Sequence, residues 1–363
     1  MPDLHNCSVL IVDDTEINID ILFETIGNLY NISTAADGES ALEKVTEQAP
    51  DLILLDIMMP GIDGYEVCRR LKGDQKTTHI PIIFLTSMTS LLEEEKGLKL
   101  GAVDYITKPF TPELVKARVK NQLQLKLYQD KLEELVKQRT VELELTQEIT
   151  IECMGTLAEY RDSETGGHIQ RTKYYVKALA EKLKHHPKFS SFLTEKTIDL
   201  LCKSAPLHDV GKIGVPDHIL LKPGKLTDDE CEEMKRHTIY GRDTIKRAEE
   251  RLGEKSFLYL AHEMAESHQE KWDGSGYPNG WSGEQIPISG RIMALADVFD
   301  AIISKRIYKE SIPHSKAVQI IFEGRGRHFD PDIVDAFMEL TEEFRSIALK
   351  HADYEEERQN LMK

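Results

Sequence analysis

The sequence predicts a multidomain chain, in which an α/β doubly wound domain with a five-stranded parallel sheet is joined by a long helix to an all-α domain. Three observations support this prediction. Short apolar runs alternate with amphipathic stretches over the first 125 residues. Turn-forming residues then almost disappear from residue 111 to about residue 149. Beyond residue 150 the pattern is mostly helical, with glycine and proline between the helices.

The composition indicates a globular protein that does not bind DNA. A length of 363 residues suggests two or three domains, and 40% hydrophobic residues are enough for ordinary cores. Lys and Arg number 46 against 63 Asp and Glu, a formal charge of −17, whereas a nucleic-acid binder would carry a basic face. The five cysteines are scattered without a CxxC pair, which favours reduced cytosolic thiols over disulfides or a zinc site.

We expect a cytoplasmic protein with no membrane partner. The start of the chain, "MPDLHNCSVLIVDD", lacks the basic and apolar segments of a signal peptide. No apolar run approaches the ~20 residues of a membrane span.

The first domain reads as strands and helices in turn. The runs "SVLIVDD", "DLILLD", "PIIFLTS" and "AVDYITKPF" are typical of buried parallel strands, and "GESALEKVTEQ" and "GYEVCRRLK" of helices between them. In such folds functional groups lie at the carboxyl ends of strands. Five polar residues end these runs: Asp13, Asp14, Asp56, Thr86 and Lys108.

These five residues together suggest phosphoryl chemistry. Converging carboxylates repel one another unless a cation lies between them, and oxygen ligands suit Mg²⁺. Asp56 would then be a nucleophile, with Lys108 and Thr86 placed to contact an incoming phosphoryl group. Each residue alone could be a turn former that happens to end a strand. All five at successive strand ends argue against that interpretation.

The motifs "VDD", "LLDIMMPGIDGYEV", "LTS" and "DYITKPF" resemble the response-regulator receiver domain, which we assign to residues 1–125. The resemblance implies that Asp56 is the phosphoacceptor and that Asp13 and Asp14 bind Mg²⁺. It also implies that Thr86 and Tyr105 form a switch pair and that Lys108 contacts the phosphoryl group. A cognate histidine kinase would be the phosphodonor.

Residues 111–152 are predicted to form a connector helix, continuous with the last helix of the receiver. Four apolar residues follow the 3-4-3 spacing of a coiled-coil seam: Leu125, Tyr128, Leu132 and Leu135. The register weakens at Arg139 and Glu142, which occupy the next seam positions. A parallel dimer through this helix and a single solvated helix are both open; we favour the homodimer.

In the third segment, "LHDVGK" places His208 beside Asp209, with Lys212 close by. Neighbours on a helix point roughly 100° apart and do not normally serve one spot. They can share a wide centre, such as two metal ions ~3.5–4 Å apart with an aspartate bridging them. Further candidate ligands are Glu164, His168, His237, His268 and Asp297. Imidazoles and carboxylates without thiolate suit Fe, Mn, Ni or Zn.

Each candidate also has an ordinary structural interpretation. A single histidine in a helical domain is more often a hydrogen-bonded or surface residue than a ligand. We assign that role to His185, His186, His218, His262, His314, His328 and His351. His208 and Asp209 alone could be a hydrogen-bonded pair at a helix end.

The motifs "GGHIQR", "HDVGK", "EKWDGSGYP", "GRIMALADVFDAI" and "SKRIYK" together resemble the HD-GYP domain, a subgroup of the HD phosphohydrolases, over residues 150–345. The resemblance implies an all-helical fold. It also implies a metal-dependent phosphodiesterase that linearises cyclic di-GMP to pGpG and in some members continues to GMP. The last segment, 346–363, is then expected to be a charged C-terminal tail.

The resemblance assigns roles to named positions. It implies a centre of two or three divalent ions, with Fe or Mn favoured and Ni or Zn as alternatives, and it makes Asp209 the bridge and Glu164 a ligand of a third ion. The other implied metal ligands are His168, His208, His237, His268 and Asp297. The residues implied to lie around the substrate are Lys212, Arg306, Lys309, Gly276, Tyr277 and Pro278.

One position departs from the family pattern. Many members have His-His-Glu where this chain has His268, Gln269 and Glu270. Gln269 offers an amide oxygen in place of an imidazole nitrogen, which is a weaker ligand for these metals. Since six predicted ligands and Lys212 remain, hydrolysis is still expected.

We therefore predict a response regulator in which phosphorylation of Asp56 controls a cyclic di-GMP phosphodiesterase. Two cations would lower the pKa of a bridging water, and Lys212, Arg306 and Lys309 would stabilise the charge on the phosphate. Two alternatives stay open. One is a hydrolase for another cyclic dinucleotide or a nucleotide, and the other is a non-catalytic module that binds a ligand or a protein.

Overall fold

The computed structural model describes residues 4–87, 91–161, 167–252, 257–304 and 311–362. The chain divides into two compact units, Met1–Val141 and Glu142–Lys363. Across the described residues, no helix is both long and apolar enough to span a membrane.

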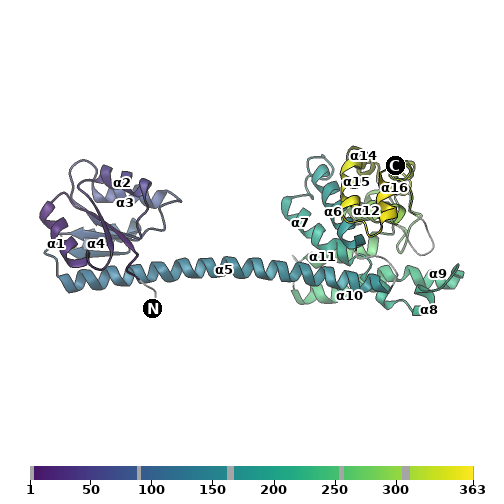
Figure 1. The fold of residues 1–363 in the computed structure, drawn as a ribbon, viewed down its shortest axis with the longest axis horizontal. Helices are drawn as coiled ribbons and strands as arrows, with labels where there is room; N and C mark the ends of the chain where they lie inside the picture. Colours follow the sequence, from purple (N-terminus) through teal and green to yellow (C-terminus); the bar gives the residue numbers. More distant parts are fainter. Residues whose placement is uncertain (1–3, 88–90, 162–166, 253–256, 305–310, 363) are drawn as a thin grey trace. The chain divides into compact units, whose positions relative to one another are not determined.

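The N-terminal unit is a parallel sheet with helices packed around it (Figure 1). The sheet has five strands in the order β2-β1-β3-β4-β5. The strands are β1 (Ser8–Val12), β2 (Asn31–Ala35), β3 (Leu52–Asp56), β4 (Ile82–Thr86) and β5 (Asp104–Thr107). The helices that follow the first four strands are α1 (Glu16–Ile26), α2 (Gly38–Glu47), α3 (Gly64–Gly73) and α4 (Leu91–Lys99). The predicted doubly wound fold is confirmed.

Successive residues of each strand pack into two different cores, because side chains alternate between the faces of a sheet. On one face, α2 and α3 cover Leu10 and Leu55. On the other, α1 and the first turns of α5 cover Ile11 and Leu54. With both faces covered, polar groups of the strands lie mainly at their ends, where the predicted phosphoryl site is located.

Helix α5 (Pro112–Tyr160) is a single helix of 49 residues, and it extends the connector predicted over 111–152 by two turns. Its start agrees with the prediction, since Pro112 suits a first helical turn. The boundary between the two compact units falls within this helix. The four apolar residues of the predicted seam are 47–61% exposed.

The C-terminal unit is helical, and among its described residues there is no β-strand, only an isolated bridge between Arg325 and Phe329. The longer helices are α6 (Gly167–Leu183), α7 (Glu195–Ser204), α10 (His237–Leu252), α11 (Phe257–Ser267), α12 (Ile288–Ile303), α13 (His314–Glu323) and α15 (Thr341–Lys350). Shorter ones are η1 (Ala205–Leu207), η2 (Val210–Gly214), α8 (Asp217–Leu220), α9 (Asp228–Lys235), η3 (Gly283–Gln285), α14 (Pro331–Glu339) and α16 (Glu355–Leu361). The predicted all-α class is confirmed.

An aromatic cluster holds α6 against α12, α14 and α15. Tyr175 of α6 stacks on Phe344 with ring centroids 4.4 Å apart and meets the edge of Phe299 at 5.4 Å. Phe337 completes the cluster, 5.0 Å from Phe344. Aromatic pairs of this geometry are worth about 0.5–1.5 kcal/mol beyond their burial. The cluster therefore fixes the relative positions of α6 and α12, which both carry candidate metal ligands.

The last residues of the chain differ from the charged tail expected over 346–363. This segment holds the end of α15 and all of α16, and Leu361 is buried in the main core of the unit. Glu357 is also buried and accepts hydrogen bonds from the backbone N–H groups of Asp353 at 3.1 Å and Tyr354 at 3.4 Å. The expectation of a tail needs correction, because this acidic segment forms a helix that packs on the unit through a few buried side chains.

Candidate functional site

The predicted phosphoryl site of the N-terminal unit forms at the carboxyl ends of β1, β3 and β5. Asp13 and Asp56 are buried and Asp14 is exposed, and one oxygen of each lies within 4.8 Å of the other two. The Lys108 ammonium joins them, with Nζ 2.8 Å from Asp13 Oδ2 and 2.9 Å from Asp56 Oδ2. Three carboxylates this close fit a hard divalent cation with oxygen ligands.

The charges in this pocket oppose one another. Burial raises the pKa of Asp56, the hydrogen bond from Lys108 works against that rise, and the nearby charge of Asp13 adds to it. Burial lowers the pKa of Lys108, but its hydrogen bonds to Asp13 and Asp56 outweigh this and the pKa is raised. Lys108 therefore carries its positive charge beside Asp56 at neutral pH.

The two residues of the predicted switch pair lie on neighbouring strands. Thr86 is buried at the end of β4, and its backbone oxygen accepts a hydrogen bond from the N–H of Lys108 at 2.7 Å. Tyr105 is in β5, one strand away, where the guanidinium of Arg118 lies 5.2 Å from its ring centre. The structure thus brings together the residues that the sequence placed at successive strand ends.

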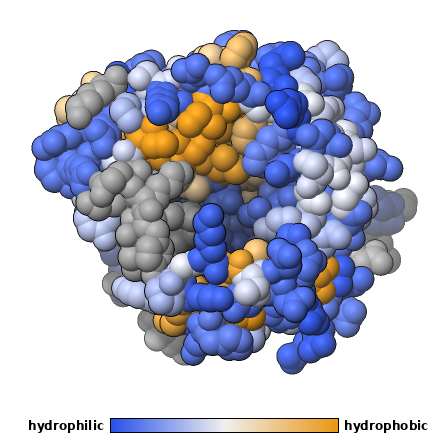
Figure 2. Space-filling model, turned by 90° about the vertical axis from the view of Figure 1, so that its right-hand side faces the viewer, coloured by the Kyte–Doolittle hydropathy of each residue, from blue (hydrophilic) through white to orange (hydrophobic). Residues whose placement is uncertain are grey.

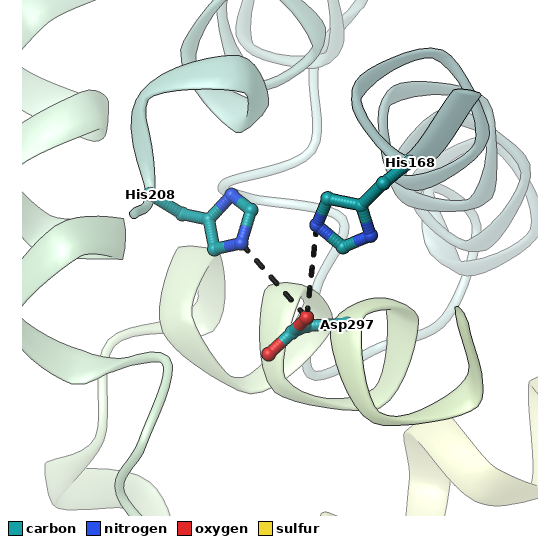
Figure 3. A group of neighbouring side chains, drawn as sticks. All are labelled: His168, His208 and Asp297. Atoms are coloured by element: carbon teal, nitrogen blue, oxygen red, sulfur yellow. Dashed lines mark ion pairs between the residues drawn. The ribbon is translucent and has the colours of Figure 1, made fainter. Parts of the chain in front are cut away.

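In the C-terminal unit, six of the predicted metal ligands form two adjacent groups of buried side chains. His168, His208 and Asp297 make one group, shown in Figure 3 with both imidazoles turned toward the Asp297 carboxylate. Asp209, His237 and His268 make the other. The ligands come from α6, the turn between η1 and η2, α10, the residue after α11, and α12.

Asp209 lies between the histidines of the two groups. His237 Nε2 and His268 Nε2 are each 3.3 Å from Asp209 Oδ1. His208 Nε2 is 3.5 Å from Asp209 Oδ2 and 3.9 Å from Asp297 Oδ1. The two oxygens of one carboxylate therefore face different imidazoles, which is the arrangement required of a bridging ligand.

All four imidazoles turn their Nδ1 atom away from the centre. The Nδ1 atoms of three of them lie against backbone oxygens: His208 against Ala205 at 2.9 Å, His237 against Met234 at 2.8 Å, and His268 against Met264 at 3.0 Å. Nδ1 of His168 instead lies 2.8 Å from Asp300 Oδ2. Each Nδ1 thus has an acceptor outside the centre, so each Nε2 directs a lone pair into it, as metal-binding histidines do. The donor set fits divalent metal ions.

The interruption between two short helices at His208 and Asp209 explains how adjacent residues can face one centre. Helix η1 ends at Leu207 and η2 begins at Val210, so the pair occupies the turn between them. Gly211 follows, and a Cβ there would lie 1.9 Å from the backbone oxygen of His237. The glycine therefore allows the turn to lie directly against α10, which brings His237 to Asp209.

Burial and charge keep His208 and Asp209 in metal-binding forms. Burial lowers the pKa of His208 to about 4, so its imidazole is neutral at physiological pH. Burial alone would raise the pKa of Asp209, but the charge of Lys212 outweighs it. The pKa of Asp209 is therefore well below its usual range. Lys212 Nζ lies 2.7 Å from Asp209 Oδ2.

The loop of Gly276, Tyr277 and Pro278 lies beside this centre. The ring centroid of Tyr277 is 6.3 Å from that of His237, and burial, followed by the charges of Asp209 and Asp297, raises its pKa above the usual value. A Cβ on Gly276 would lie 2.3 Å from the backbone nitrogen of Lys271, so the loop folds back tightly. The buried Glu270 holds it through the N–H groups of Asn279 at 2.7 Å and Trp281 at 3.1 Å.

The remaining predicted residues are placed differently. Gln269 is half-buried, and its backbone oxygen accepts the N–H of Tyr277 at 3.2 Å. Glu164, Arg306 and Lys309 lie outside the described residues.

Three residues near the centre were missed at the level of sequence. Asp300 accepts two hydrogen bonds from the buried Arg171, at 2.7 and 3.0 Å, while it contacts His168. Glu159 of α5 is 2% exposed, and its Oε1 lies 3.5 Å from His168 Nε2. Asp300 and Arg171 could have been found, because each lies three residues after a predicted ligand on the same helix.

Two family models match the chain. A response regulator receiver domain matches residues 9–120, and an HD domain matches residues 152–333.

Two similar proteins match nearly the whole chain, and a third matches about half of it. A "Probable cyclic di-GMP phosphodiesterase" of Vibrio cholerae is 46% identical over 363 residues, which cover 98% of this chain and 82% of that protein. The "Cyclic di-GMP phosphodiesterase response regulator RpfG" of Xanthomonas campestris is 37% identical over 345 residues, 91% of this chain and 87% of that protein. A "3'3'-cGAMP-specific phosphodiesterase 2" of Vibrio cholerae is 41% identical over 207 residues, 57% of this chain and 37% of that protein. This chain therefore belongs to the response regulators that join an N-terminal receiver domain to a C-terminal HD domain of the HD-GYP type.

Proposed function

We propose that this protein is a metal-dependent phosphodiesterase that opens cyclic di-GMP to pGpG, and that phosphorylation of Asp56 controls this activity. The observation that carries the proposal is the pair of ligand groups that meet at Asp209, with four imidazoles held by their Nδ1 atoms. Two relatives that are named cyclic di-GMP phosphodiesterases and that match this chain over both domains support this substrate.

Different residues would bind the metal ions, stabilise charge on the phosphate and donate a hydrogen bond. Two divalent ions, Fe or Mn by the donor set, would be held by the two ligand groups and supply Lewis acidity and a water of lowered pKa. Lys212 lies beside the bridging Asp209, where its ammonium can stabilise negative charge that develops on a phosphate. The neutral phenol of Tyr277 is a hydrogen-bond donor at the same edge.

Positive charge at the centre also accounts for substrate binding by an acidic chain. The net charge is −17, and a cyclic dinucleotide is a dianion. The face of the C-terminal unit in Figure 2 is largely hydrophilic and has a hollow near its middle, with apolar residues at one side. A local cationic centre can bind an anion against an unfavourable overall charge, because screening limits other charges to about 8 Å at physiological salt.

The test is a product assay on the full-length protein, purified with and without oxygen, with the metal content measured on the same samples. We expect cyclic di-GMP to be converted to a linear dinucleotide, and the Asp209→Asn variant to lose at least about a hundredfold in rate because the bridging ligand is weakened. His185→Ala is the matched control, since His185 is exposed and belongs to neither ligand group. A metal-loaded protein that leaves the substrate intact would contradict the proposal.

A second substrate has one observation in its favour, the relative named as specific for 3'3'-cGAMP. The same assay with 3'3'-cGAMP in place of cyclic di-GMP separates the two. Faster turnover of 3'3'-cGAMP would replace the proposed substrate, whereas a silent, metal-empty site would favour a binding module.

The regulatory part of the proposal needs the complete chain. Beryllofluoride mimics a phosphoryl group on an aspartate, so it should alter turnover by the wild-type protein. Coupling energies between sites are typically about 1–3 kcal/mol, or about 5–150-fold. Asp56→Asn should abolish the response, and equal turnover with and without the mimic would refute the control by phosphorylation.

The protein would also bind a histidine kinase, Mg²⁺ and a second copy of itself. A histidine kinase would phosphorylate Asp56, with Mg²⁺ held by Asp13 and Asp14. The exposed apolar residues of α5 are the proposed contact between two copies of the chain.

A further inference from the structure

We propose that Arg161, at the end of the connector helix, is a positioning residue that ties α5 to the stretch carrying Asp209 and Lys212. Through this contact, a movement of α5 reaches the residues of the metal centre. The inference rests on the proposed function, and it names the contact through which phosphorylation would act on that site.

Arg161 directly follows the last residue of α5, and its side chain holds the chain at the end of η2 and just beyond it. The guanidinium donates hydrogen bonds to the backbone oxygens of Ile213 and of Val215, the latter at 3.4 Å, and it forms an ion pair with Asp217. Every second residue of this stretch is therefore bound to one side chain. A planar guanidinium with several N–H donors suits this role, whereas a compact ammonium is a poor match for three partners spread along a chain.

The bonds to the main chain matter more than the ion pair. The side chain of Asp217 is 71% exposed, and exposed ion pairs contribute little because water and salt screen them. Ile213 is the residue after Lys212, and both belong to η2. A displacement of Arg161 would therefore pull on the backbone next to the ammonium that lies 2.7 Å from Asp209.

A second contact of α5 lies at the start of the same stretch. A Cβ on Gly155 would be 2.5 Å from the backbone oxygen of Pro206, so the helix backbone lies directly against the turn that precedes His208. At a rise of about 1.5 Å per residue, Gly155 and Arg161 lie about 9 Å apart along the axis. The end of α5 thus contacts the chain both before and after the residues that serve the proposed centre.

Helix α10 limits how η2 can move. A Cβ on Gly211 would lie 1.9 Å from the backbone oxygen of His237, and one on Gly214 would lie 2.9 Å from the ring of Tyr240. Because η2 packs on α10 without room for a side chain, a shift imposed by α5 changes the fit between η2 and α10. The separation of 3.3 Å between His237 Nε2 and Asp209 Oδ1 depends on that fit.

The segment between Lys212 and His237 can carry the shift as one body. It contains α8 and α9 and has a small core of its own, which includes Val215, Ile219 and Leu220. Arg161 holds this segment at its start, and its last residue directly precedes His237, a member of the second ligand group. Since α5 begins in the N-terminal unit, a rotation or translation of this helix is applied at the bridging aspartate.

The test compares backbone hydrogen exchange in the full-length protein with and without beryllofluoride and Mg²⁺. Exchange in residues 210–217 is followed by mass spectrometry in wild type, Arg161→Met and Arg161→Lys, and turnover of cyclic di-GMP is measured on the same samples. The matched control is Arg247→Met, an exposed arginine of α10. In wild type and control we expect beryllofluoride to change the exchange rate by about fivefold or more, the lower end of typical coupling between sites. In Arg161→Met the change should almost disappear, with Arg161→Lys in between.

A purely structural role for Arg161 predicts a different pattern. It would lower the Tm with and without beryllofluoride and leave the change in exchange as in wild type, and that result overturns the proposal. Should Arg161→Met fail to fold, a wild-type response of Arg161→Lys would overturn it equally. Wild-type turnover that responds to beryllofluoride while exchange in 210–217 does not would also refute it, yet leave the control by phosphorylation standing. Absent turnover would contradict the proposed enzyme, whereas exchange would still decide the role of Arg161.

Discussion

At the scale of single residues, the C-terminal unit depends on a buried ion pair that orients a metal ligand. Arg171 and Asp300 are each 1% exposed, and Arg171 also reaches Ser304 Oγ at 2.9 Å and the backbone oxygen of His351 at 2.8 Å. Burial would raise the pKa of Asp300, but the charge of Arg171 outweighs this and keeps it well below its usual range. One guanidinium thus links His168, through Asp300, to the C-terminal segment.

We expect Arg171→Met to lower the free energy of unfolding by about 3–5 kcal/mol, because it leaves the Asp300 carboxylate buried without its counter-charge. Urea unfolding of the metal-free protein measures the change. Arg325→Met is the control, since Arg325 pairs with Asp335 at the surface, and it should have little effect. Equal stability of the two variants would show that the buried pair does not hold the fold.

At the scale of elements, α5 and α9 show how local sequence and packing combine. Helix α9 begins with a capping box, in which Thr227 Oγ1 accepts the N–H of Glu230 and the Glu230 carboxylate accepts the N–H of Thr227. This cap follows from a four-residue pattern. Helix α5, in contrast, carries a glycine in its interior, which weakens a helix by about 1 kcal/mol relative to alanine, and only the contact with Pro206 explains it.

The cap of α9 predicts a pH dependence. The hydrogen bond from Lys222, together with the Thr227 N–H, lowers the pKa of Glu230 to about 2. A depressed folded-state pKa stabilises the protein above the unfolded pKa of about 4.3, and this contribution is lost as the pH falls toward 2. The Tm difference between wild type and Glu230→Gln should therefore shrink from pH 6 to pH 3. A difference that stays constant over this range would contradict the role of the ionised cap.

The packing of α5 predicts the outcome of an alanine substitution. Gly155→Ala should lower the Tm, because a Cβ 2.5 Å from the Pro206 oxygen forces a shift that outweighs the gain in helix propensity. The expected loss in stability is about 1–3 kcal/mol. Gly73→Ala, at the end of α3 with open space around its Cβ, is the control and should be neutral or stabilising. A more stable Gly155→Ala would refute the close contact.

At the scale of the whole molecule, the exposed apolar residues of α5 predict self-association. Leu125, Tyr128 and Leu132 line a shallow groove on this helix together with Val103 and Val136. The four of these residues that lie on α5 are 52–64% exposed. A row of exposed apolar side chains on a helix favours burial against a partner. The 3-4-3 spacing of the seam residues matches a second copy of the same helix.

We expect Leu132→Glu to convert the full-length protein to monomers, since two like charges would face each other across the seam. Sedimentation velocity at several concentrations measures the change. Leu143→Glu, which is exposed on α5 but outside the seam, is the control. A wild-type protein that is monomeric at micromolar concentration would contradict the dimer.

The sequence by itself predicted the two folds and the strand-end residues around Asp56 and, through its resemblance to a known family, the six candidate ligands that the structure brings together around Asp209. The folds depend on residue types at local spacings, and the resemblance depends on short motifs, both of which a linear chain records directly. Only the tertiary structure decided that the histidines point their Nε2 atoms inward, that Arg171 holds Asp300, and that the last helix packs through Leu361. It also decided that Glu159 of the connector helix reaches His168. Burial and direction arise from contacts between segments far apart in the chain, and no local pattern specifies which segments those are.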